Sequence, residues 1–173
     1  MRVAVLLEDH YQVLEVWYPY LRLREEGVET VLVGTGKKSY RSKEGYPADE
    51  ECSIFDADAG SFDGVVIPGG YAPDILRRYK EVNGFVKKMF EDNKCVAAIC
   101  HGGWVLASAG ILAKKKVTGF IAIKDDLVNA GATFIDKEVV IDGNLITSRN
   151  PYDLPAFSRA ILRFLKESQA SRR

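Results

Sequence analysis

The sequence predicts an α/β fold in which helices cover both faces of a mostly parallel sheet. Short apolar runs alternate with segments whose apolar residues recur at helical spacing, as at Val82, Phe85, Val86 and Met89. The runs themselves, such as residues 95–99, are apolar throughout, as strands are when both faces of a sheet are buried. Strands that alternate with helices in this way are typical of parallel sheets.

The predicted elements follow one another along the chain. The predicted strands are residues 3–7, 28–33, 64–68, 95–99, 132–135, 139–141 and 145–148, and the predicted helices are residues 11–26, 82–90, 104–109 and 154–165. We expect Pro19 to kink or break the first helix and Gly27 to cap its end. Asp142-Gly143 predicts a hairpin, Asp153 predicts an N-cap, and the polar segment 34–60 predicts a small hairpin excursion.

Length and charge narrow the class of protein. The 173 residues predict one domain over residues 1–168 and a frayed polar tail over residues 169–173. Lysine plus arginine and aspartate plus glutamate each number 24, so the chain has no basic surplus for nucleic acid. Its apolar runs fall far short of the roughly 20 residues of a membrane-spanning helix. We therefore expect partners that are neither nucleic acids nor membranes.

Cysteine and histidine usage points to a reducing compartment. The chain has an odd number of cysteines, Cys52, Cys95 and Cys100, and no secretion signal, which predicts a cytoplasmic protein. Cys95 and Cys100 stand at the two ends of one predicted strand, roughly 16 Å apart, too far for a disulfide. Two histidines, His10 and His101, are too few for a zinc cluster. We expect neither a metal nor a cofactor.

The strongest chemical signal is Cys100-His101-Gly102-Gly103, which follows the predicted strand 95–99 and begins a helix. A strand–turn–helix of this kind, a nucleophile elbow, holds its side chain at the carboxyl ends of the strands, where open α/β sheets bind ligands. A helix N-terminus and an adjacent imidazole should lower the thiol pKa below its reference of about 8.5. The alternative is a buried strand-end cysteine beside an ordinary cap residue, but the glycines and the strand favour a nucleophile.

The segment Ala98-Ile99-Cys100-His101-Gly102 resembles the elbow of the PfpI-type intracellular proteases, relatives of the Parkinsonism-associated deglycase in the class I glutamine amidotransferase-like superfamily. Other motifs agree with that family, in the family order, along nearly the whole chain: Tyr18-Pro19-Tyr20, Gly45-Tyr46, Pro68-Gly69-Gly70, Ala72-Pro73-Asp74, Lys124-Asp125-Asp126 and Asn129-Ala130-Gly131. The resemblance implies a single-domain, flavodoxin-like sandwich. Glutaminase activity is not expected, because no histidine follows His101.

The resemblance also implies roles for individual residues. Cys100 would be the nucleophile and His101 its general base, and the backbone N–H groups of Gly70 and His101 would form the oxyanion hole. Asp74 stands where relatives carry a glutamate that completes the triad across a subunit boundary, although it could instead cap a helix. Glu15 corresponds to a glutamate that hydrogen-bonds to the thiol, although it could instead be a solvated charge on a helix face.

Several further residues are expected to line the pocket, with Gly69 of the glycine loop among them. His10 and Gln12 stand where PfpI-type relatives carry acids, and Gln12 cannot relay a proton as a carboxylate can. His10 could bring a second base or be a surface histidine. Phe120 replaces a tyrosine of the relatives, so a phenolic donor is lost. Tyr46 could supply such a donor or be a packed turn residue.

Three functions are consistent with these residues. We expect first a cysteine hydrolase of the PfpI-like protease or amidase type, acting on a small peptide. The alternative is a glyoxalase- or deglycase-like enzyme for small carbonyls such as methylglyoxal, in which Glu15 or His101 moves a proton. A third is a non-enzymatic, redox-responsive stress protein or chaperone that oxidises at Cys100. The implied shared triad predicts self-association, as a dimer or as a hexamer built from three dimers, with the active site near the interface.

Overall fold

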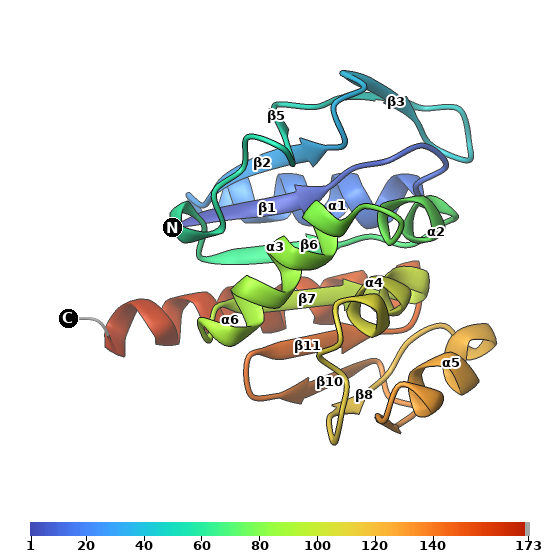
Figure 1. Ribbon diagram of the computed structural model, residues 1–173. Helices are drawn as coiled ribbons and strands as arrows, with labels where there is room; N and C mark the ends of the chain where they lie inside the picture. Colours follow the sequence, from blue (N-terminus) through green and yellow to red (C-terminus); the bar gives the residue numbers. More distant parts are fainter. Residues whose placement is uncertain (172–173) are drawn as a thin grey trace.

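A seven-stranded sheet forms the centre of the protein (Figure 1), of which the computed structural model describes residues 1–171. The strands lie in the order β10-β11-β7-β6-β1-β2-β5. Their bounds are β1 Arg2–Leu6, β2 Glu29–Gly34, β5 Cys52–Ser53, β6 Gly64–Ile67, β7 Cys95–Ile99, β10 Val139–Asp142 and β11 Leu145–Ser148. Neighbouring strands are parallel except in the β10–β11 hairpin. The predicted, mostly parallel sheet is confirmed.

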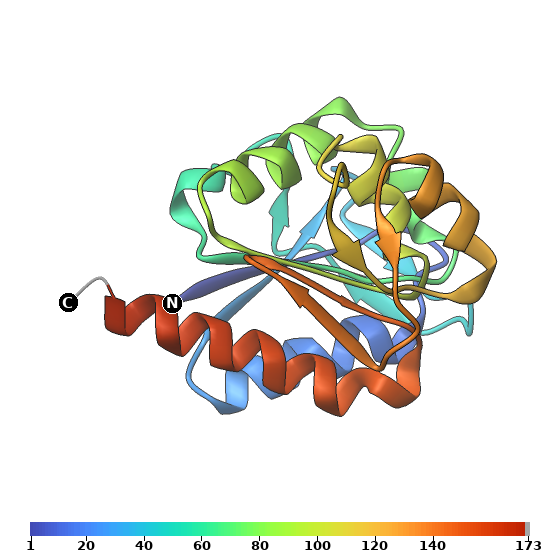
Figure 2. The same ribbon diagram turned by 90° about the horizontal axis from the view of Figure 1, so that it is seen from below.

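Helices cover both faces of this sheet (Figure 2). Helices α1 (Val13–Glu25) and α6 (Leu154–Ser171) contact each other on one face, and α3 (Lys80–Glu91) and α4 (Gly103–Ser108) lie on the other. The remaining helical elements are α2 Ala72–Leu76, α5 Lys124–Asn129, η1 Ala59–Ser61, η2 Cys100–Gly102, η3 Ile121–Ile123 and η4 Pro151–Asp153. Within residues 1–171, no helix is both long enough and apolar enough to cross a membrane.

Hydrophobic spacing accounts for the layers. Val82, Phe85, Val86 and Met89 lie on one face of α3, and all four are buried in the core. Strand β7 is buried along its whole length, as expected of a strand with a helical layer on each side. The central strands therefore form a rigid frame that fixes the positions of the loops at their ends.

Two small sheets lie outside the central one. The polar segment after β2 forms the antiparallel pair β3 (Ser39–Arg41) and β4 (Pro47–Asp49), as predicted. Strands β8 (Lys116–Val117) and β9 (Thr133–Phe134) form a parallel pair. The sequence does not predict β8, because two residues are too few to show a strand periodicity.

Three local predictions need correction. Helix α1 runs through Pro19 without a break, because burial of its inner face supports the helix despite one lost backbone hydrogen bond. The Asp153 carboxylate accepts hydrogen bonds from Arg149, and the side chain of Asn150 caps the turn that leads into α6. Helix α6 continues to Ser171, so residues 169–171 of the predicted tail are helical, whereas residues 172–173 lie outside the described part.

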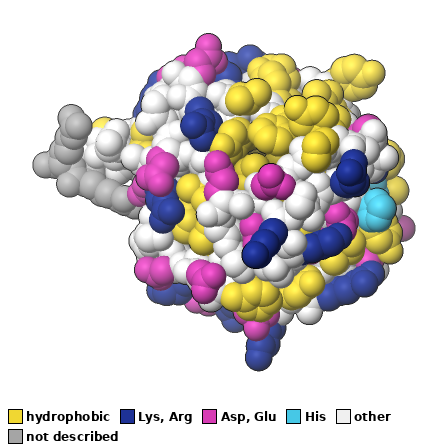
Figure 3. All heavy atoms as spheres, turned by 90° about the horizontal axis from the view of Figure 1, so that it is seen from above, with side chains coloured by type: hydrophobic (Ala, Val, Ile, Leu, Met, Phe, Trp, Pro, Cys, Tyr) yellow, Lys and Arg dark blue, Asp and Glu magenta, His cyan; other side chains and the backbone are white. Residues whose placement is uncertain are grey.

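Charges of both signs are mixed over the surface, which agrees with the balanced composition. Figure 3 shows Lys or Arg side chains next to Asp or Glu side chains over much of one face, with hydrophobic side chains gathered in one area. The exposed hydrophobic residues on helix α1 are Leu14, Tyr18 and Leu21. Their spacing places them on one face of that helix.

The carboxyl ends of β1, β6 and β7 meet at one edge of the sheet, on the right in Figure 1, where α2 and α4 also lie. Loops 7–12, 68–71 and 100–102 start from these three strand ends. Open α/β sheets bind ligands at this edge. The fold therefore brings the two predicted chemical loops, around residues 69 and 100, to one place.

Candidate active site

Strand β7 ends in a tight turn that presents Cys100 at the edge of the sheet. The φ of Cys100 is +59°, an uncommon conformation for a residue other than glycine and typical of a nucleophile elbow. Gly102 leaves room for the turn, since a Cβ atom there would lie 2.6 Å from the backbone oxygen of Ile67. The predicted strand–turn–helix is present.

A pocket of about 350 Å³ opens beside the elbow. The residues that line it are Gln12, Glu15, Lys43, Gly70, Tyr71, Cys100, His101, Trp104, Phe120, Asn150 and Pro151. Cys100 is 8% exposed, so its sulfur is nearly buried and still borders the pocket. A volume of this size suits a small molecule.

His101 lies directly beside the nucleophile. Its Nδ1 atom is 3.2 Å from the Cys100 sulfur. Phe120 stacks on the imidazole with 5.0 Å between ring centroids, and Trp104 meets it edge-on at 5.1 Å. Burial and the charge of Lys43 lower the pKa of His101, which favours the neutral imidazole near pH 7. No carboxylate of the described residues forms an ion pair with this ring, so aromatic contacts orient it.

Glu15 lines the pocket and is fully buried, which removes the alternative of a solvated helix-face charge. Its Oε2 atom accepts a hydrogen bond of 2.6 Å from the Gly69 N–H, and the carboxyl group also interacts with the Cys100 thiol. Burial raises the pKa of Glu15 to about 7, although the Gly69 hydrogen bond opposes this. The group therefore titrates near neutral pH, as a general acid–base catalyst should.

The thiol of Cys100 is not the low-pKa group that the sequence analysis expects. Burial and the nearby Glu15 carboxylate raise its pKa to about 12, and hydrogen bonds from the Gly70 and His101 N–H groups only partly oppose this. The elbow turn is too short for its helix dipole to outweigh burial. Cys100 is therefore a thiol at neutral pH and needs a base in the same step in which it attacks.

The glycine loop after β6 faces the sulfur as predicted. Gly70 has a φ of +75°, and its N–H group and that of His101 both stabilise negative charge on the Cys100 sulfur. The two donors thus lie beside the sulfur, as the predicted oxyanion hole requires. A Cβ atom on Gly69 would lie 2.5 Å from Glu15 Oε2, so only glycine fits between this carboxyl and the elbow.

Two of the departures from the family pattern have structural roles in the pocket. Gln12 is the N-cap of α1, and its Oε1 accepts a hydrogen bond of 2.9 Å from the backbone N–H of Glu15. Phe120 donates its backbone N–H to the oxygen of Cys100 and stacks on His101. Both residues therefore contact the predicted catalytic residues and help to fix their positions.

Four residues that the sequence suggests for the site do not line the pocket within one chain: Asp74, His10, Tyr46 and Gly69, the last of which lies between Glu15 and the elbow. Asp74 is the third residue of α2 rather than its N-cap, and its carboxylate pairs with Arg78, which holds its pKa below the usual range. His10 is exposed, with a φ of +62°, and its ring meets Tyr71 edge-on. Tyr46 packs against Trp17 instead.

The structure adds five residues that the sequence analysis did not identify: Lys43, Tyr71, Trp104, Asn150 and Pro151. Tyr71 and Trp104 directly follow the glycine loop and the elbow, so adjacency to these motifs could have indicated them. Asn150 follows the carboxyl end of β11, and the rule that ligands bind at strand ends could have found it. Lys43 belongs to the β3–β4 connection, and no local pattern indicates its contact with the pocket.

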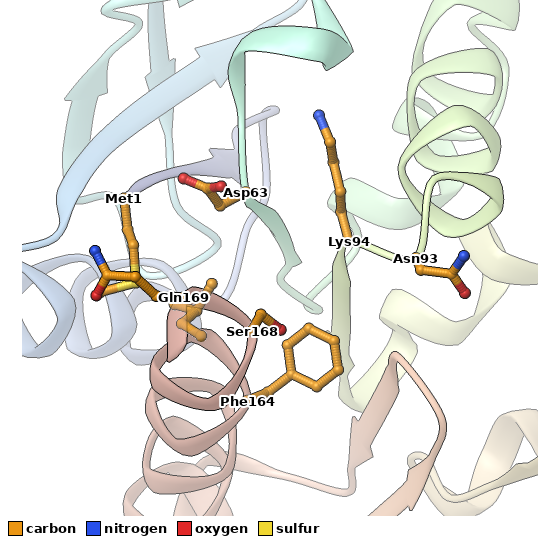
Figure 4. A pocket seen from close by; sticks show the side chains of 8 residues that line it. Met1, Asp63, Asn93, Lys94, Phe164, Ser168 and Gln169 are labelled. Atoms are coloured by element: carbon orange, nitrogen blue, oxygen red, sulfur yellow. The ribbon is translucent and has the colours of Figure 1, made fainter. Parts of the chain in front are cut away.

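A second hollow, of about 200 Å³, lies at the opposite edge of the sheet (Figure 4). Its lining includes Met1, Lys94 and the end of α6 but neither cysteine nor histidine. The Lys94 ammonium is bound to the carbonyl oxygens of Ala59 and Gly60. Among residues 1–171, no three His, Cys, Asp or Glu side chains gather where they could hold a metal ion. The chemistry is therefore assigned to the elbow pocket.

The elbow, together with the buried contact between Glu15 and Cys100, defines a class of α/β proteins whose chemistry uses a cysteine at a strand end. Comparison with known families is more specific. Residues 1–164 match the family described as the DJ-1/PfpI family, and the chain belongs to this family. The predicted resemblance is confirmed.

Relatives and solved structures agree with this assignment. "Deglycase TK1284" from Thermococcus kodakarensis is 42% identical over 166 residues, which cover 96% of this chain and 100% of the relative. "Putative cysteine protease YraA" from Bacillus subtilis is 40% identical and covers 95% of this chain and 98% of its own. A two-domain protein from Anabaena variabilis, with DJ-1/ThiJ/PfpI-like and ferritin-like domains, superposes with a TM-score of 0.94 at 43% identity. The match covers 95% of this chain and 48% of that protein, about half its length.

Proposed function

We propose that the protein is a thiol-dependent enzyme that acts on small reactive carbonyl compounds, such as methylglyoxal. The observation that carries this proposal is the position of the buried Glu15 carboxyl beside the elbow. A Cβ atom on Gly69 would lie 2.5 Å from Glu15 Oε2 and 2.7 Å from the Cys100 Cβ, and burial raises the pKa of this carboxyl to about 7. His101, by contrast, has no carboxylate partner among residues 1–171, and hydrolysis by a complete triad would require one. Relatives named deglycase support the same reading.

In the first step, the Cys100 sulfur attacks the aldehyde carbon and a C–S bond forms. The Glu15 carboxylate takes the thiol proton, and the electron pair of the C=O bond moves to the oxygen. The N–H groups of Gly70 and His101 donate to this oxygen, and the proton then passes from Glu15 to it. The product is a hemithioacetal, in which S–H has added across the carbonyl group.

In the second step, the neutral imidazole of His101 removes the hydrogen of the former aldehyde carbon as a proton, and a proton is returned to the adjacent ketone carbon. The hydroxyl proton of the hemithioacetal moves to the ketone oxygen, so the first carbon becomes a thioester carbonyl and its neighbour carries the hydroxyl group. The aldehyde carbon is thereby oxidised and its neighbour reduced, so no external oxidant is needed. Water then cleaves the resulting thioester, which releases a 2-hydroxy acid and restores the Cys100 thiol. In sum, one molecule of water is added to the dicarbonyl.

Methylglyoxal consumption tests this function directly. We expect the wild type to convert methylglyoxal to lactate, and Cys100→Ser to lower the rate by at least about 10³-fold, because the nucleophile is lost. Cys95→Ser is the matched control, since Cys95 is buried in β7 and does not line the pocket. Proton NMR follows both the loss of substrate and the formation of product. Equal rates for the wild type and Cys100→Ser would refute the proposal.

A PfpI-like peptidase is the second candidate, favoured by the 3.2 Å distance between His101 Nδ1 and the Cys100 sulfur. A peptidase of this type needs a carboxylate beside His101, and Asp74 of a second copy of the chain is the candidate. We propose self-association through the exposed face of α1, where Leu14, Tyr18 and Leu21 expose hydrophobic area. The third candidate, a redox-responsive stress protein, is supported by the relative named general stress protein 18 from Bacillus subtilis, whereas the burial that raises the pKa of Cys100 opposes oxidation of its thiol.

Mixing two inactive variants tests the shared triad. We expect Cys100→Ser and Asp74→Ala to be inactive separately against a fluorogenic peptide and to recover up to about a quarter of the activity when mixed. Recovery arises because a mixed dimer contains one intact site. Leu21→Glu should shift the sedimentation of the protein from dimer or larger to monomer and abolish this recovery. A wild type that sediments as a monomer at micromolar concentration would rule out both the assembly and the triad.

A further inference from the structure

Three polar side chains at the pocket play no part in the proposed chemistry: Gln12, Lys43 and Asn150. They come from three separate segments of the chain, the start of α1, the β3–β4 connection and the turn after β11. Their convergence on one pocket is a property of the fold and not of any local motif. Each of the three side chains has a hydrogen-bond donor available to a ligand.

Both amide side chains have their oxygen engaged by the backbone. Gln12 Oε1 accepts from the N–H of Glu15 at 2.9 Å, and Asn150 Oδ1 accepts from the N–H of Tyr152 at 3.0 Å. These hydrogen bonds fix which end of each amide is the oxygen. The NH₂ groups, Nε2 of Gln12 and Nδ2 of Asn150, therefore remain as donors for a ligand.

Lys43 adds a cation to these donors. Its backbone N–H is bound to the oxygen of Tyr11, which anchors this segment beside the pocket. Its ammonium forms a loose, exposed ion pair with Glu44 at 3.9 Å, beyond hydrogen-bond distance, and the other Glu44 oxygen accepts from the N–H of Val13. The charge of Lys43 partly offsets the burial that raises the pKa of Glu15, and it adds to the burial that lowers the pKa of His101, so its field reaches both groups.

The remaining pocket groups do not cancel this positive character. Glu15 lines the pocket, but its carboxyl group is fully buried and bound to the Gly69 N–H, and burial raises its pKa to about 7, which favours the neutral form below that pH. Trp104 donates its ring N–H to Asp126, and Tyr71 interacts with Asp74 and Arg78, so neither offers an acceptor that the structure leaves unused. The polar atoms left to a ligand at Gln12, Lys43 and Asn150 are all donors.

We propose that Lys43, Gln12 and Asn150 form an anion subsite, and that the preferred substrates are small carbonyl compounds that carry a carboxylate or a phosphate group. The inference deepens the proposed function and rests on it, because the bound anion is a substrate only if the protein acts on carbonyl compounds. The ammonium would hold the charge of the anion, and the two amides would donate to its oxygens. The reactive carbonyl would then face Cys100 with the anion held at the rim, so the subsite would set specificity rather than perform chemistry.

A matched pair of alkylating reagents tests the subsite without relying on turnover. Iodoacetate and iodoacetamide react with Cys100 in the same way: the sulfur attacks the CH₂ carbon, iodide leaves and the thiol loses its proton. They differ in having a carboxylate or a neutral amide. We expect Lys43→Gln to lower the iodoacetate-to-iodoacetamide rate ratio by about fivefold. Any change in the Cys100 pKa affects both reagents and cancels in the ratio.

Lys80→Gln is the control, because Lys80 is 93% exposed at the start of α3 and does not line the pocket. Its rate ratio should equal that of the wild type. The ratio is measured by mass spectrometry of the Cys100 peptide at low salt, and the wild-type preference should weaken as salt is added. A Lys43→Gln ratio equal to the wild-type ratio would overturn the subsite.

Protection experiments distinguish the two anions. Lactate supplies a carboxylate and inorganic phosphate supplies a phosphate, and either should slow alkylation by iodoacetamide in the wild type more than in Lys43→Gln. Protection by only one of them identifies the anion, and protection by neither overturns the proposal. Because no turnover is needed, an intact subsite in a protein that fails to consume methylglyoxal would refute the carbonyl function alone.

Discussion

Glu15→Gln is expected to lower kcat/KM for methylglyoxal by about 10²- to 10⁴-fold, the usual contribution of a general acid–base group. The substitution keeps the size of the side chain and an oxygen for the Gly69 N–H, so the pocket should keep its shape. It removes the base that takes the proton from a thiol whose pKa is about 12. Steady-state rates by NMR provide the measurement, and Glu25→Gln, on the exposed end of the same helix, is the control. Equal rates for the wild type and Glu15→Gln would exclude Glu15 from the mechanism.

The same residue sets two pH dependences. Glu15 accepts the thiol proton only when it is ionised, so wild-type kcat/KM should rise as the pH rises through about 7, and this rise should be absent in Glu15→Gln. The free energy of unfolding moves the other way. The folded-state pKa of about 7 lies above the ordinary 4.5. The contribution of this carboxyl to the free energy of unfolding is therefore fully present below pH 4.5 and is lost as the pH rises through 7.

The cost at high pH is about 3 kcal/mol, from the difference between the two pKa values. Glu15→Gln should therefore show a flatter pH profile of unfolding free energy between pH 4.5 and 8, measured by urea denaturation. Glu25→Gln should retain the wild-type slope, because Glu25 is exposed. Parallel profiles for the wild type and Glu15→Gln would show that the buried carboxyl does not titrate in this range.

The central strands and the elbow at Cys100 could be predicted from the sequence, because both depend on local patterns of residues. The apolar run that forms β7 and the glycines after Cys100 specify a buried strand and a tight turn. Burial of Glu15 was out of reach by the same means, since periodicity does not show which neighbours cover a helix face. Only the arrangement of α1 against the glycine loop places this carboxyl beneath the sulfur.

Electrostatic properties depend even more on the tertiary structure. The helix start after Cys100 suggested a lowered thiol pKa, but the pKa is raised because Glu15 and burial act from outside the motif. Phe120 was interpreted as a lost phenolic donor, whereas the structure gives it a stacking contact with His101. In both cases the deciding partner is distant in sequence. A motif alone therefore predicts neither the direction of the Cys100 pKa shift nor the role of Phe120.

Gly70→Ala is expected to destabilise the fold far more than an alanine at another glycine of the same conformation. Gly70 has a φ of +75°, and a Cβ there would lie 2.5 Å from both the Gln12 nitrogen and the His10 oxygen. These atoms hold the loops together, since the His10 oxygen accepts from Tyr71 and the Gln12 N–H donates to Gly69. The loops would have to separate, which would also misplace the Gly70 donor of the oxyanion hole.

Gly27 provides the matched comparison, because its φ is +76° and a Cβ there would have nothing within 4 Å. Gly27→Ala should cost only the backbone strain, about 1–2 kcal/mol. Gly70→Ala should cost that amount plus about 1–3 kcal/mol for the overlap with backbone atoms. Thermal unfolding should thus show a drop in Tm for Gly70→Ala at least about 2 °C larger than for Gly27→Ala. Equal drops would mean that the two loops separate without cost, and the oxyanion donor would then be no more rigid than any exposed turn.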